Sequence, residues 1–285
     1  MYLKERVTDW NDYQLIDCGG EKKLERFGTQ YIIRSESKAL LRPTLSKKRW
    51  LEMASTPNGS KWQVEYRLDE RSSFKMELKR GSSKQIGLFP EQAPNWSWIY
   101  KRVNKIMERN RVEGRGAPSI LNLFAYTGGA SLAAKCAGAD VTHVESVRQT
   151  IALAKANMEA SSLEDIRWVQ EDALKFIERE VKRGRSYQGV ILDPPAYGLG
   201  PKGERWQLKE SIDRLLSLVA ALLERQNSFL LLNLYTTGYT PKIADTLLRK
   251  ALAPSKAGKS QYGTLTLEDS FGKILEMSHF ARVEL

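Results

Sequence analysis

The stretch GVILDPPAYGLGPKGERW, residues 189–206, combines an apolar strand with an unusually stiff end. The apolar run up to Leu192 predicts a buried strand, after which Asp193 meets two prolines. A residue before proline is held in extended backbone, and each proline fixes its own φ and lacks an N–H donor. The strand therefore ends in a rigid rim of oxygen acceptors, with the ring of Tyr197 beyond it. Such a rim suits a planar group that bears an amine; the alternative is a rigid loop with a surface tyrosine.

Outward from this stretch, segments of strand and helix character alternate from about residue 87 to the C-terminus. Strands are expected over 119–125, 140–145, 166–170, 188–193 and 228–235, with helices between them and a closing hairpin over 263–269 and 273–285. Ser146 is the expected N-cap of the helix over 146–160. This alternation predicts an α/β fold with a doubly wound, mostly parallel, Rossmann-like sheet. Residues 1–86 predict a small N-terminal, mainly β domain, which leaves 87–285 for the larger domain.

The chain is basic, with 45 Lys and Arg against 34 Asp and Glu, a net charge of +11 and a pI near 9.5. Such an excess favours a polyanionic partner, and the alternative is a soluble protein that happens to be basic; the charge alone names no function. Without an apolar leader or an apolar run near the roughly 20 residues that cross a membrane, we expect a cytoplasmic protein that does not bind membranes. Two cysteines, Cys18 and Cys136, and two histidines favour neither a disulfide framework nor a metal site. The oligomeric state is open.

Three further strand ends carry residues suited to a nucleotide-like ligand, and ligands of such sheets bind beyond the carboxyl ends of the strands. Gly128 and Gly129 permit positive φ and a close approach at a helix N-terminus, which suits an anionic group or simply a tight turn. Glu145 can accept hydrogen bonds from ribose hydroxyls, and Asp172 can reach an adenine amino group or cap the next helix. The fingerprint G-x-G-x-x-G and the P-loop are absent, which disfavours a nicotinamide-dependent oxidoreductase and a P-loop enzyme.

The order of the segments NLFAYTGG, VTHVE, QEDA and ILDPPAYG closely resembles a class I S-adenosylmethionine-dependent methyltransferase. The segments GLFPEQAPNW, DPPAYGLGPKGERW and LLNLYTTGY resemble a bacterial group related to the large-subunit ribosomal RNA methyltransferases. Upstream, YQLIDCGGEKKLERFG resembles the β domain that precedes the catalytic domain in that group. The resemblance runs from about Tyr13 to the C-terminus, and its motifs are more specific for the class than for the substrate.

The resemblance implies S-adenosyl-L-methionine as the cofactor and no metal. The loop after the first strand would hold its methionine part, Glu145 its ribose and Asp172 its adenine, while Asp193 would close the pocket beside the sulfonium. The implied cofactor-binding residues are Gln92, Asn122, Phe124, Ala125, Tyr126, Thr127, Gly128, Glu145, Ser146, Asp172, Ala173 and Asp193. The implied catalytic residues are Asp193, Pro194, Pro195 and Tyr197.

The methylated atom is expected to be a nitrogen. Relatives that methylate cytosine C5 use a cysteine near the fourth or later strand ends, where DPPAYG and NLYTTGY contain none. The DPPAYG loop instead resembles the Asp/Asn-Pro-Pro-aromatic loop of amino-group methyltransferases. We therefore expect methylation of a base nitrogen in RNA, with ribosomal RNA favoured. RNA contact would fall to the β domain and to the basic stretches 101–111 and 180–185, which are equally interpreted as solvated helix faces. Methylation of a protein or small-molecule amine stays open, and so does a non-catalytic RNA-binding factor that retains the fold.

Overall fold

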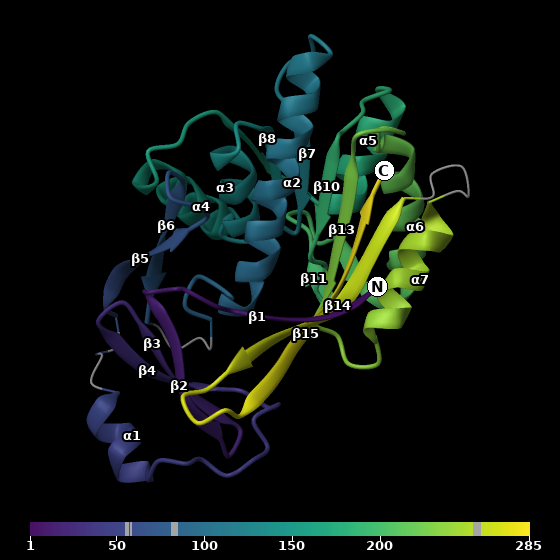
Figure 1. The fold of residues 1–285 in the computed structure, drawn as a ribbon. Helices are drawn as coiled ribbons and strands as arrows, with labels where there is room; N and C mark the ends of the chain where they lie inside the picture. Colours follow the sequence, from purple (N-terminus) through teal and green to yellow (C-terminus); the bar gives the residue numbers. More distant parts are fainter. Residues whose placement is uncertain (55–56, 58, 81–84, 253–257) are drawn as a thin grey trace.

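A central sheet with helices on both faces dominates the computed structural model, which describes residues 1–285 apart from 55–56, 58, 81–84 and 253–257 (Figure 1). Eight strands form this sheet in the order β1-β14-β15-β13-β10-β7-β8-β9. The strands are β1 (Tyr2–Arg6), β7 (Ser119–Leu123), β8 (Asp140–Glu145), β9 (Ile166–Gln170), β10 (Gly189–Leu192), β13 (Phe229–Leu234), β14 (Lys259–Glu268) and β15 (Ile274–Glu284). Five neighbouring strands are parallel: β13, β10, β7, β8 and β9. Strand β15 lies between β13 and β14 and pairs with both in the antiparallel direction. The predicted doubly wound, mostly parallel sheet is confirmed.

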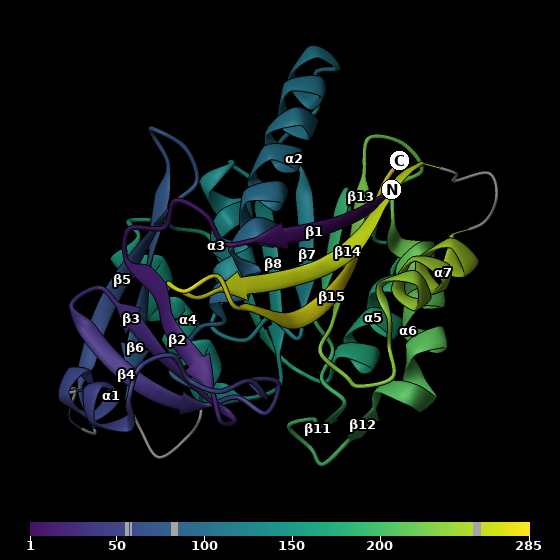
Figure 2. The same ribbon diagram turned by 60° about the horizontal axis from the view of Figure 1, so that its bottom comes forward.

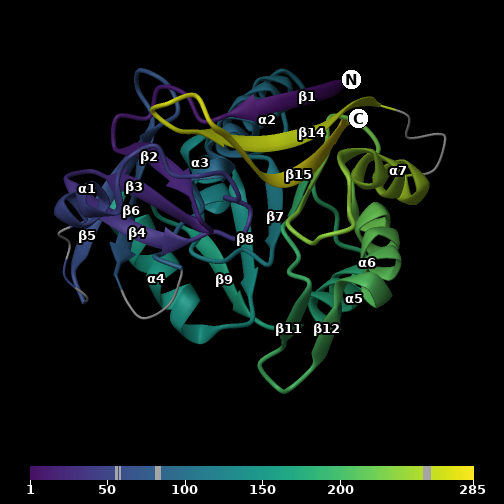
Figure 3. The same ribbon diagram turned by 90° about the horizontal axis from the view of Figure 1, so that it is seen from below.

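The helices form two layers, one on each face of the large sheet (Figure 1 and Figure 3). One layer contains α2 (Ala93–Val112), α3 (Gly129–Cys136) and α4 (Arg148–Ala160), and the other contains α5 (Ala173–Lys182), α6 (Leu208–Leu222) and α7 (Pro241–Ala251). Successive residues of a strand point to opposite faces, so a strand between two helical layers must be apolar on both. In β10, Ile191 belongs to the cluster under α2 and α3, while Val190 and Leu192 belong to the cluster under α5–α7.

The N-terminal segment builds two small antiparallel sheets, in agreement with the expected mainly β domain. Strands β2 (Tyr13–Gly19), β3 (Lys22–Phe27) and β4 (Gln30–Ser35) form the first, and β5 (Lys61–Arg67) with β6 (Ser73–Lys79) forms the second. A short helix, α1 (Lys47–Met53), begins at Ser46, whose side chain accepts a hydrogen bond from the Arg49 N–H. A 3-10 turn, η1 (Pro90–Gln92), then leads into α2.

The first strand does not belong to these small sheets. β1 pairs in parallel with β14, from Tyr2 opposite Tyr262 to Arg6 opposite Thr266, so it is the edge strand of the large sheet. Residues 2–6 of the expected domain 1–86 therefore lie in the sheet of the other domain. Figure 2 shows the β14–β15 hairpin beside β1, extending from the large sheet to the N-terminal strands.

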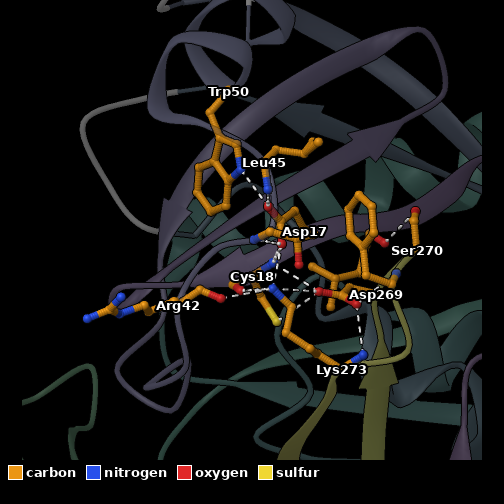
Figure 4. Close-up of polar contacts among 11 residues, drawn as sticks. Asp17, Cys18, Arg42, Leu45, Trp50, Asp269, Ser270 and Lys273 are labelled. Atoms are coloured by element: carbon orange, nitrogen blue, oxygen red, sulfur yellow. Dashed lines mark hydrogen bonds and ion pairs between the residues drawn. The ribbon is translucent and has the colours of Figure 1, made fainter.

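A polar cluster, which we call the clasp, joins the tip of this hairpin to the N-terminal domain (Figure 4). It consists of the buried carboxylates of Asp17 and Asp269 and the partly buried Lys273. The Lys273 Nζ donates to Asp17 Oδ1 at 2.6 Å and to the Cys18 carbonyl at 2.6 Å, and lies 3.3 Å from Asp269 Oδ2. Asp17 also accepts from the Leu45 N–H at 2.7 Å and from the Trp50 indole N–H at 2.9 Å. The clasp thus links β2, the loop before α1, and the hairpin tip.

The predicted cap of α4 was wrong. The helix begins at Arg148 with Val147 at the N-cap position, and no side chain caps it. The Ser146 hydroxyl lies 3.3 Å from Glu145 Oε1 and donates to it instead. Serine is a favoured N-cap, but here the Glu145 carboxylate accepts from the N–H groups of Ser146 and Val147 and holds both residues outside the helix, which therefore begins later.

Candidate active site

Two adjoining cavities lie at the carboxyl ends of the parallel strands. The main cavity has a volume of about 470 Å³, within the usual range for a small-molecule site, and a smaller one has about 60 Å³. Phe89, Phe124, Tyr126 and Asp193 line both of them. The two cavities therefore form one continuous site that spans the ends of β8, β7 and β10.

The stiff end of β10 forms the floor of this site. Asp193 is partly buried, and its Oδ1 accepts a hydrogen bond from the Asn233 amide at 2.9 Å. In the part of the chain that the structure describes, no donor reaches its Oδ2 or the Pro194 carbonyl. The Pro195 carbonyl accepts from the Trp206 indole N–H at 2.7 Å, which fixes the rim against the β11 (Tyr197–Leu199) and β12 (Arg205–Gln207) hairpin. Among the described residues, Asp193 Oδ2 and the Pro194 carbonyl are thus left without a donor, and both belong to residues that line the main cavity.

Burial raises the pKa of Asp193 from its ordinary value to about 7. Loss of hydration disfavours the charged carboxylate, and the nearby charge of Glu91 acts in the same direction, while the Asn233 hydrogen bond opposes both. A carboxyl group with a pKa near neutrality can exchange a proton during a reaction at physiological pH. Asp193 is therefore suited to proton transfer as well as to hydrogen bonding.

The carboxylate of Glu145 is oriented by backbone N–H groups at the end of β8. Its Oε2 accepts from the Tyr126 N–H at 3.0 Å, and its Oε1 accepts from the Ser146 and Val147 N–H groups at 2.9 and 3.0 Å. Each carboxylate oxygen can accept more than one hydrogen bond, so Oε2 retains capacity toward the main cavity, which Glu145 lines. This is a fixed acceptor suited to hydroxyl groups.

Asp172 caps a helix, which is one of the two interpretations that its sequence position allowed. It is the N-cap of α5, where its Oδ1 accepts from the Lys175 N–H at 3.0 Å. It also lines the main cavity beside Ala173, and no hydrogen bond to its Oδ2 occurs in the described part of the chain. The cap leaves one oxygen available to a donor such as an amino group.

The loop between β7 and α3 surrounds the smaller cavity. Gly128 has φ +93°, a conformation that favours glycine, and Gly129 packs so closely under Trp96 that a Cβ atom would lie 2.8 Å from the indole ring. The first N–H groups of α3 lack intrahelical partners, as at every helix start, and suit a carboxylate. With Glu145 and Asp172 on one side, this arrangement fits a nucleoside that carries an amino-acid-like tail.

The predicted site residues fall into three groups. Those that line the main cavity are Phe124, Tyr126, Glu145, Ser146, Asp172, Ala173, Asp193, Pro194 and Pro195. Those that line the smaller cavity are Gln92, Asn122, Phe124, Ala125, Tyr126, Thr127, Gly128 and Asp193. Tyr197 lines neither cavity and is 76% exposed on β11.

The structure adds residues to the site that the sequence prediction missed. Phe89, Trp206 and Tyr235 line the main cavity, and Glu91 is buried behind Tyr235, whose hydroxyl donates to its Oε1 at 3.0 Å. The sequence contains one indication of these contacts, because Asn233 is the single polar residue in the apolar strand FLLLNL. That signal indicates a buried polar contact, and the partner proves to be Asp193.

The cysteines and histidines lie outside this site. Burial raises the pKa of Cys18 to about 12 and that of Cys136 to about 11, and neither lines the two cavities. Both thiols are therefore poor nucleophiles at neutral pH, because the thiolate is the reactive form. Within the described ranges, no group of three or more His, Cys, Asp or Glu side chains is placed to hold a metal ion. Nor does any helix in those ranges have the length and apolarity to cross a membrane.

Comparison with known proteins gives partial matches to curated relatives. A family model described as conserved hypothetical protein 95 matches residues 104–215. Ribosomal RNA large subunit methyltransferase I of Shewanella amazonensis is 30% identical over 103 residues, 35% of this chain and 25% of that protein. An uncharacterized RNA methyltransferase of Thermotoga maritima is 31% identical over 108 residues, 38% of this chain and 24% of that protein. The chain thus spans about a quarter of the length of these relatives.

A solved structure matches nearly the whole chain. The SAM-dependent methyltransferase from Agrobacterium tumefaciens superposes with a TM-score of 0.89 and 30% sequence identity, over 99% of this chain and 93% of that one. Agreement of this extent covers both the N-terminal strands and the large sheet with its strand-end loops. The chain therefore belongs to the class I S-adenosylmethionine-dependent methyltransferases and is related to the large-subunit ribosomal RNA methyltransferases.

Proposed function

We propose that this protein transfers the methyl group of S-adenosylmethionine to a nitrogen atom of a base in RNA, with ribosomal RNA as the favoured substrate. One observation carries the choice of nitrogen: the unpaired Asp193 Oδ2 and Pro194 carbonyl at the floor of the cavity. Two adjacent acceptors suit the two N–H bonds of an amino group. Their hydrogen bonds would leave the nitrogen lone pair directed away from the rim.

The residues divide the work between the two substrates. S-adenosylmethionine supplies an electrophilic methyl group, so the protein mainly has to align the acceptor nitrogen with it. Glu145 and Asp172 would hold the nucleoside, and the loop before α3 the methionine part. Asp193 would bind the acceptor amine and take the proton that the methylated nitrogen must release. A carboxyl group with a pKa of about 7 suits that exchange.

The basic stretches proposed as RNA contacts lie away from the cavity. Residues 101–111 and 180–185 belong to the C-terminal parts of α2 and α5 and the turn after α5, just before β7 and β10 begin. They therefore lie at the amino ends of the parallel strands, opposite the carboxyl ends where the cavity lies. Several of these cations are paired, Arg102 with Glu284 and Arg109 with Glu113. Figure 1 shows α1 and β11 at the opposite end of the molecule from the C-terminal end of α2. Both α1 and the β11–β12 hairpin carry exposed cations, among them Lys48 and Arg205, and these are the better candidates for RNA contact.

Methyl transfer from radiolabelled S-adenosylmethionine into RNA tests the proposal. The substrate is ribosomal RNA from cells that lack the enzyme, with ribosomal RNA from wild-type cells as the control that should already be methylated. We expect label in the first RNA only, and a methylated base nitrogen after digestion. Label in protein rather than RNA, or a C5-methylated cytosine, would contradict it.

Replacement of Glu145 by Ala should weaken S-adenosylmethionine binding about 10- to 100-fold, since a hydrogen bond to a charged group contributes roughly 1.5–3 kcal/mol. Calorimetric titration measures the affinity. Asp140→Ala is the matched control, because this exposed carboxylate lies at the other end of the same strand. Equal affinities for the Glu145 variant and the wild type would remove Glu145 from the cofactor site.

The pKa of Asp193 predicts a pH dependence. If the carboxylate binds the amine, kcat/KM for the acceptor should fall as the pH decreases through about 7, and approach tenfold per pH unit below it. Asn233→Ala removes the hydrogen bond that stabilises the carboxylate, so it should move the midpoint to higher pH. A pH–rate profile between pH 5.5 and 9 measures both. A profile that is flat across this range would argue against a titrating Asp193.

A further inference from the structure

We propose that Tyr235, held in place by Gln92 and Glu91, is the aromatic residue that contacts the planar acceptor group during methyl transfer. This rests on the proposed function and adds a residue to it. The sequence had placed an aromatic face at the rim through Tyr197, but that ring is 76% exposed and lies outside both cavities. Another aromatic side chain must therefore form the wall beside Asp193.

Tyr235 lies on the side of Asp193 that the acceptor would occupy. In the strand order β13-β10-β7-β8-β9, the nucleoside anchors Glu145 and Asp172 stand at the ends of β8 and β9. Tyr235 directly follows β13, on the other side of β10. Side chains two residues apart in a strand share a face, so Tyr235 extends beyond Asn233, whose amide holds Asp193. The phenol thus borders the rim from the side away from the nucleoside.

The other aromatic residues of the cavity are engaged elsewhere. Phe124 and Trp206 pack against each other with ring centroids 4.8 Å apart, and the Trp206 N–H is taken by the Pro195 carbonyl. Tyr126 belongs to the loop that also surrounds the smaller cavity. Phe89 lies between Tyr126 and Tyr235, at 5.3 and 5.6 Å, and makes one aromatic wall with them. Tyr235 is the end of this wall nearest the acceptor side.

A directional chain of hydrogen bonds fixes the Tyr235 hydroxyl. Arg282 can only donate, and it donates to Asn95 Oδ1 at 3.2 Å from its Nε. The Asn95 amide then donates to Gln92 Oε1 at 2.7 Å, and the Gln92 amide donates to the Tyr235 oxygen at 3.0 Å. The single hydroxyl hydrogen of Tyr235 therefore goes to Glu91 Oε1 at 3.0 Å. Glu91 is 1% exposed, and its other oxygen has no partner in the described part of the chain.

This chain determines what Tyr235 offers to a substrate. Burial and the nearby carboxyl groups hold the pKa of Tyr235 well above its usual value, so the phenol stays protonated. With its hydrogen directed to Glu91 and its oxygen accepting from Gln92, the hydroxyl is engaged within the protein. Tyr235 therefore offers its ring face for stacking, while Asp193 Oδ2 and the Pro194 carbonyl are the acceptors. Together they select a planar group whose edge carries N–H donors.

Steady-state kinetics of Tyr235→Leu and Tyr235→Phe test the assignment, with the ribosomal RNA defined above as the substrate. Tyr235→Leu should raise the KM for RNA at least tenfold, since loss of base stacking of about 1.4 kcal/mol corresponds to a factor of ten. Tyr235→Phe keeps the ring and loses the hydrogen bonds to Gln92 and Glu91 that hold it in place, so it should lower kcat/KM about three- to tenfold. The affinity for S-adenosylmethionine should stay within about twofold in both. Tyr2→Leu, at the far edge of the sheet, is the control for loss of a tyrosine.

The positioning role of Glu91 is tested by a double-mutant cycle. If Glu91 acts by holding the Tyr235 hydroxyl, Glu91→Leu should lower kcat in the wild-type background and have little further effect in the Tyr235→Phe background. Glu91→Gln retains an acceptor oxygen and should restore most of the rate. Additive effects of Glu91→Leu and Tyr235→Phe on kcat would overturn this coupling.

The outcomes separate the inference from the proposed function. If the wild type is active and Tyr235→Leu has an unchanged KM for RNA, the inference is wrong and RNA methylation still stands. The same holds if Tyr197→Leu raises the KM for RNA at least tenfold, as expected for Tyr235→Leu. Equal losses of RNA and S-adenosylmethionine affinity in Tyr235→Leu would assign Tyr235 to the cofactor and overturn it as well. Should Tyr235→Leu unfold, Tyr235→Phe decides the assignment through kcat/KM. No methyl transfer by the wild type overturns both proposals.

Discussion

Asp193→Ala should lower kcat for methyl transfer by about 10³-fold while S-adenosylmethionine still binds with an affinity within about threefold of the wild type. The substitution removes the carboxyl group that would bind the acceptor amine and take up its proton. Loss of one preorganised polar group costs about 10²–10³ in kcat, and loss of proton transfer contributes further. Single-turnover transfer measures the rate, and calorimetry measures the cofactor affinity.

Asp193→Asn separates two parts of this effect. An amide keeps one acceptor oxygen but cannot take up a proton, so an intermediate rate is expected, without the dependence on pH near 7. A rate for Asp193→Ala close to that of the wild type would remove Asp193 from the mechanism. A large loss of cofactor affinity would instead assign it to the cofactor site.

The same residue should carry a cost in stability. The pKa of Asp193 is higher in the folded than in the unfolded protein. Its contribution to the free energy of unfolding is therefore fully present below pH 4 and is lost as the pH rises through about 7. At pH 8 the buried carboxylate should therefore destabilise the fold, by no more than roughly 4 kcal/mol, since one pKa unit corresponds to about 1.4 kcal/mol. Asp193→Asn should thus melt at a higher temperature than the wild type at pH 8, with a smaller difference at pH 5. A variant that is more stable but less active would support the interpretation that an energetically unfavourable buried carboxylate is retained for function.

The large sheet could be predicted because the same local pattern, a buried strand followed by an amphipathic helix, is repeated along the chain. Each buried strand is bounded by an amphipathic helix, and the parallel arrangement follows from that alternation. β1 could not be placed in this way. Its sequence YLKER alternates without a strong apolar face, and its partner β14 lies at the other end of the chain. Pairing between distant strands depends on tertiary structure that a local pattern does not contain.

The site residues on strand ends could be predicted for the same topological reason, whereas the aromatic face could not. In the β11–β12 hairpin, Gly198 pairs with Trp206, so these two share one face and both line the cavity. Tyr197 lies on the alternate face and is exposed. The sequence shows a tyrosine near two prolines, but the register that turns it outward is a property of the hairpin. Tyr235 was overlooked because its polar partners, Gln92 and Glu91, are far from it in sequence.

Loss of the clasp between the N-terminal domain and the β14–β15 hairpin should strongly lower the stability of the protein. Asp17→Ala should destabilise the protein by about 3–5 kcal/mol, because the fully buried Asp17 is the acceptor of the partly buried Lys273 ammonium and of several N–H donors. Thermal and urea unfolding measure the change, and Asp213→Ala, which breaks an exposed pair with Lys250, is the matched control at under 1 kcal/mol.

A double-mutant cycle shows whether the clasp acts as a unit. Lys273→Met alone should also be strongly destabilising, since it leaves the Asp17 and Asp269 carboxylates facing each other without the cation between them. Because Asp17→Asn and Lys273→Met remove partners of the same ion pair, the double variant should lose clearly less stability than the sum of the single losses. The pKa of Asp17 is lowered in the folded protein, so the contribution of the clasp is present above pH 4 and is lost as the pH falls through the lowered value. Additive losses, or a loss for Asp17→Ala as small as that for Asp213→Ala, would mean that apolar packing rather than the clasp holds the hairpin tip against the N-terminal domain.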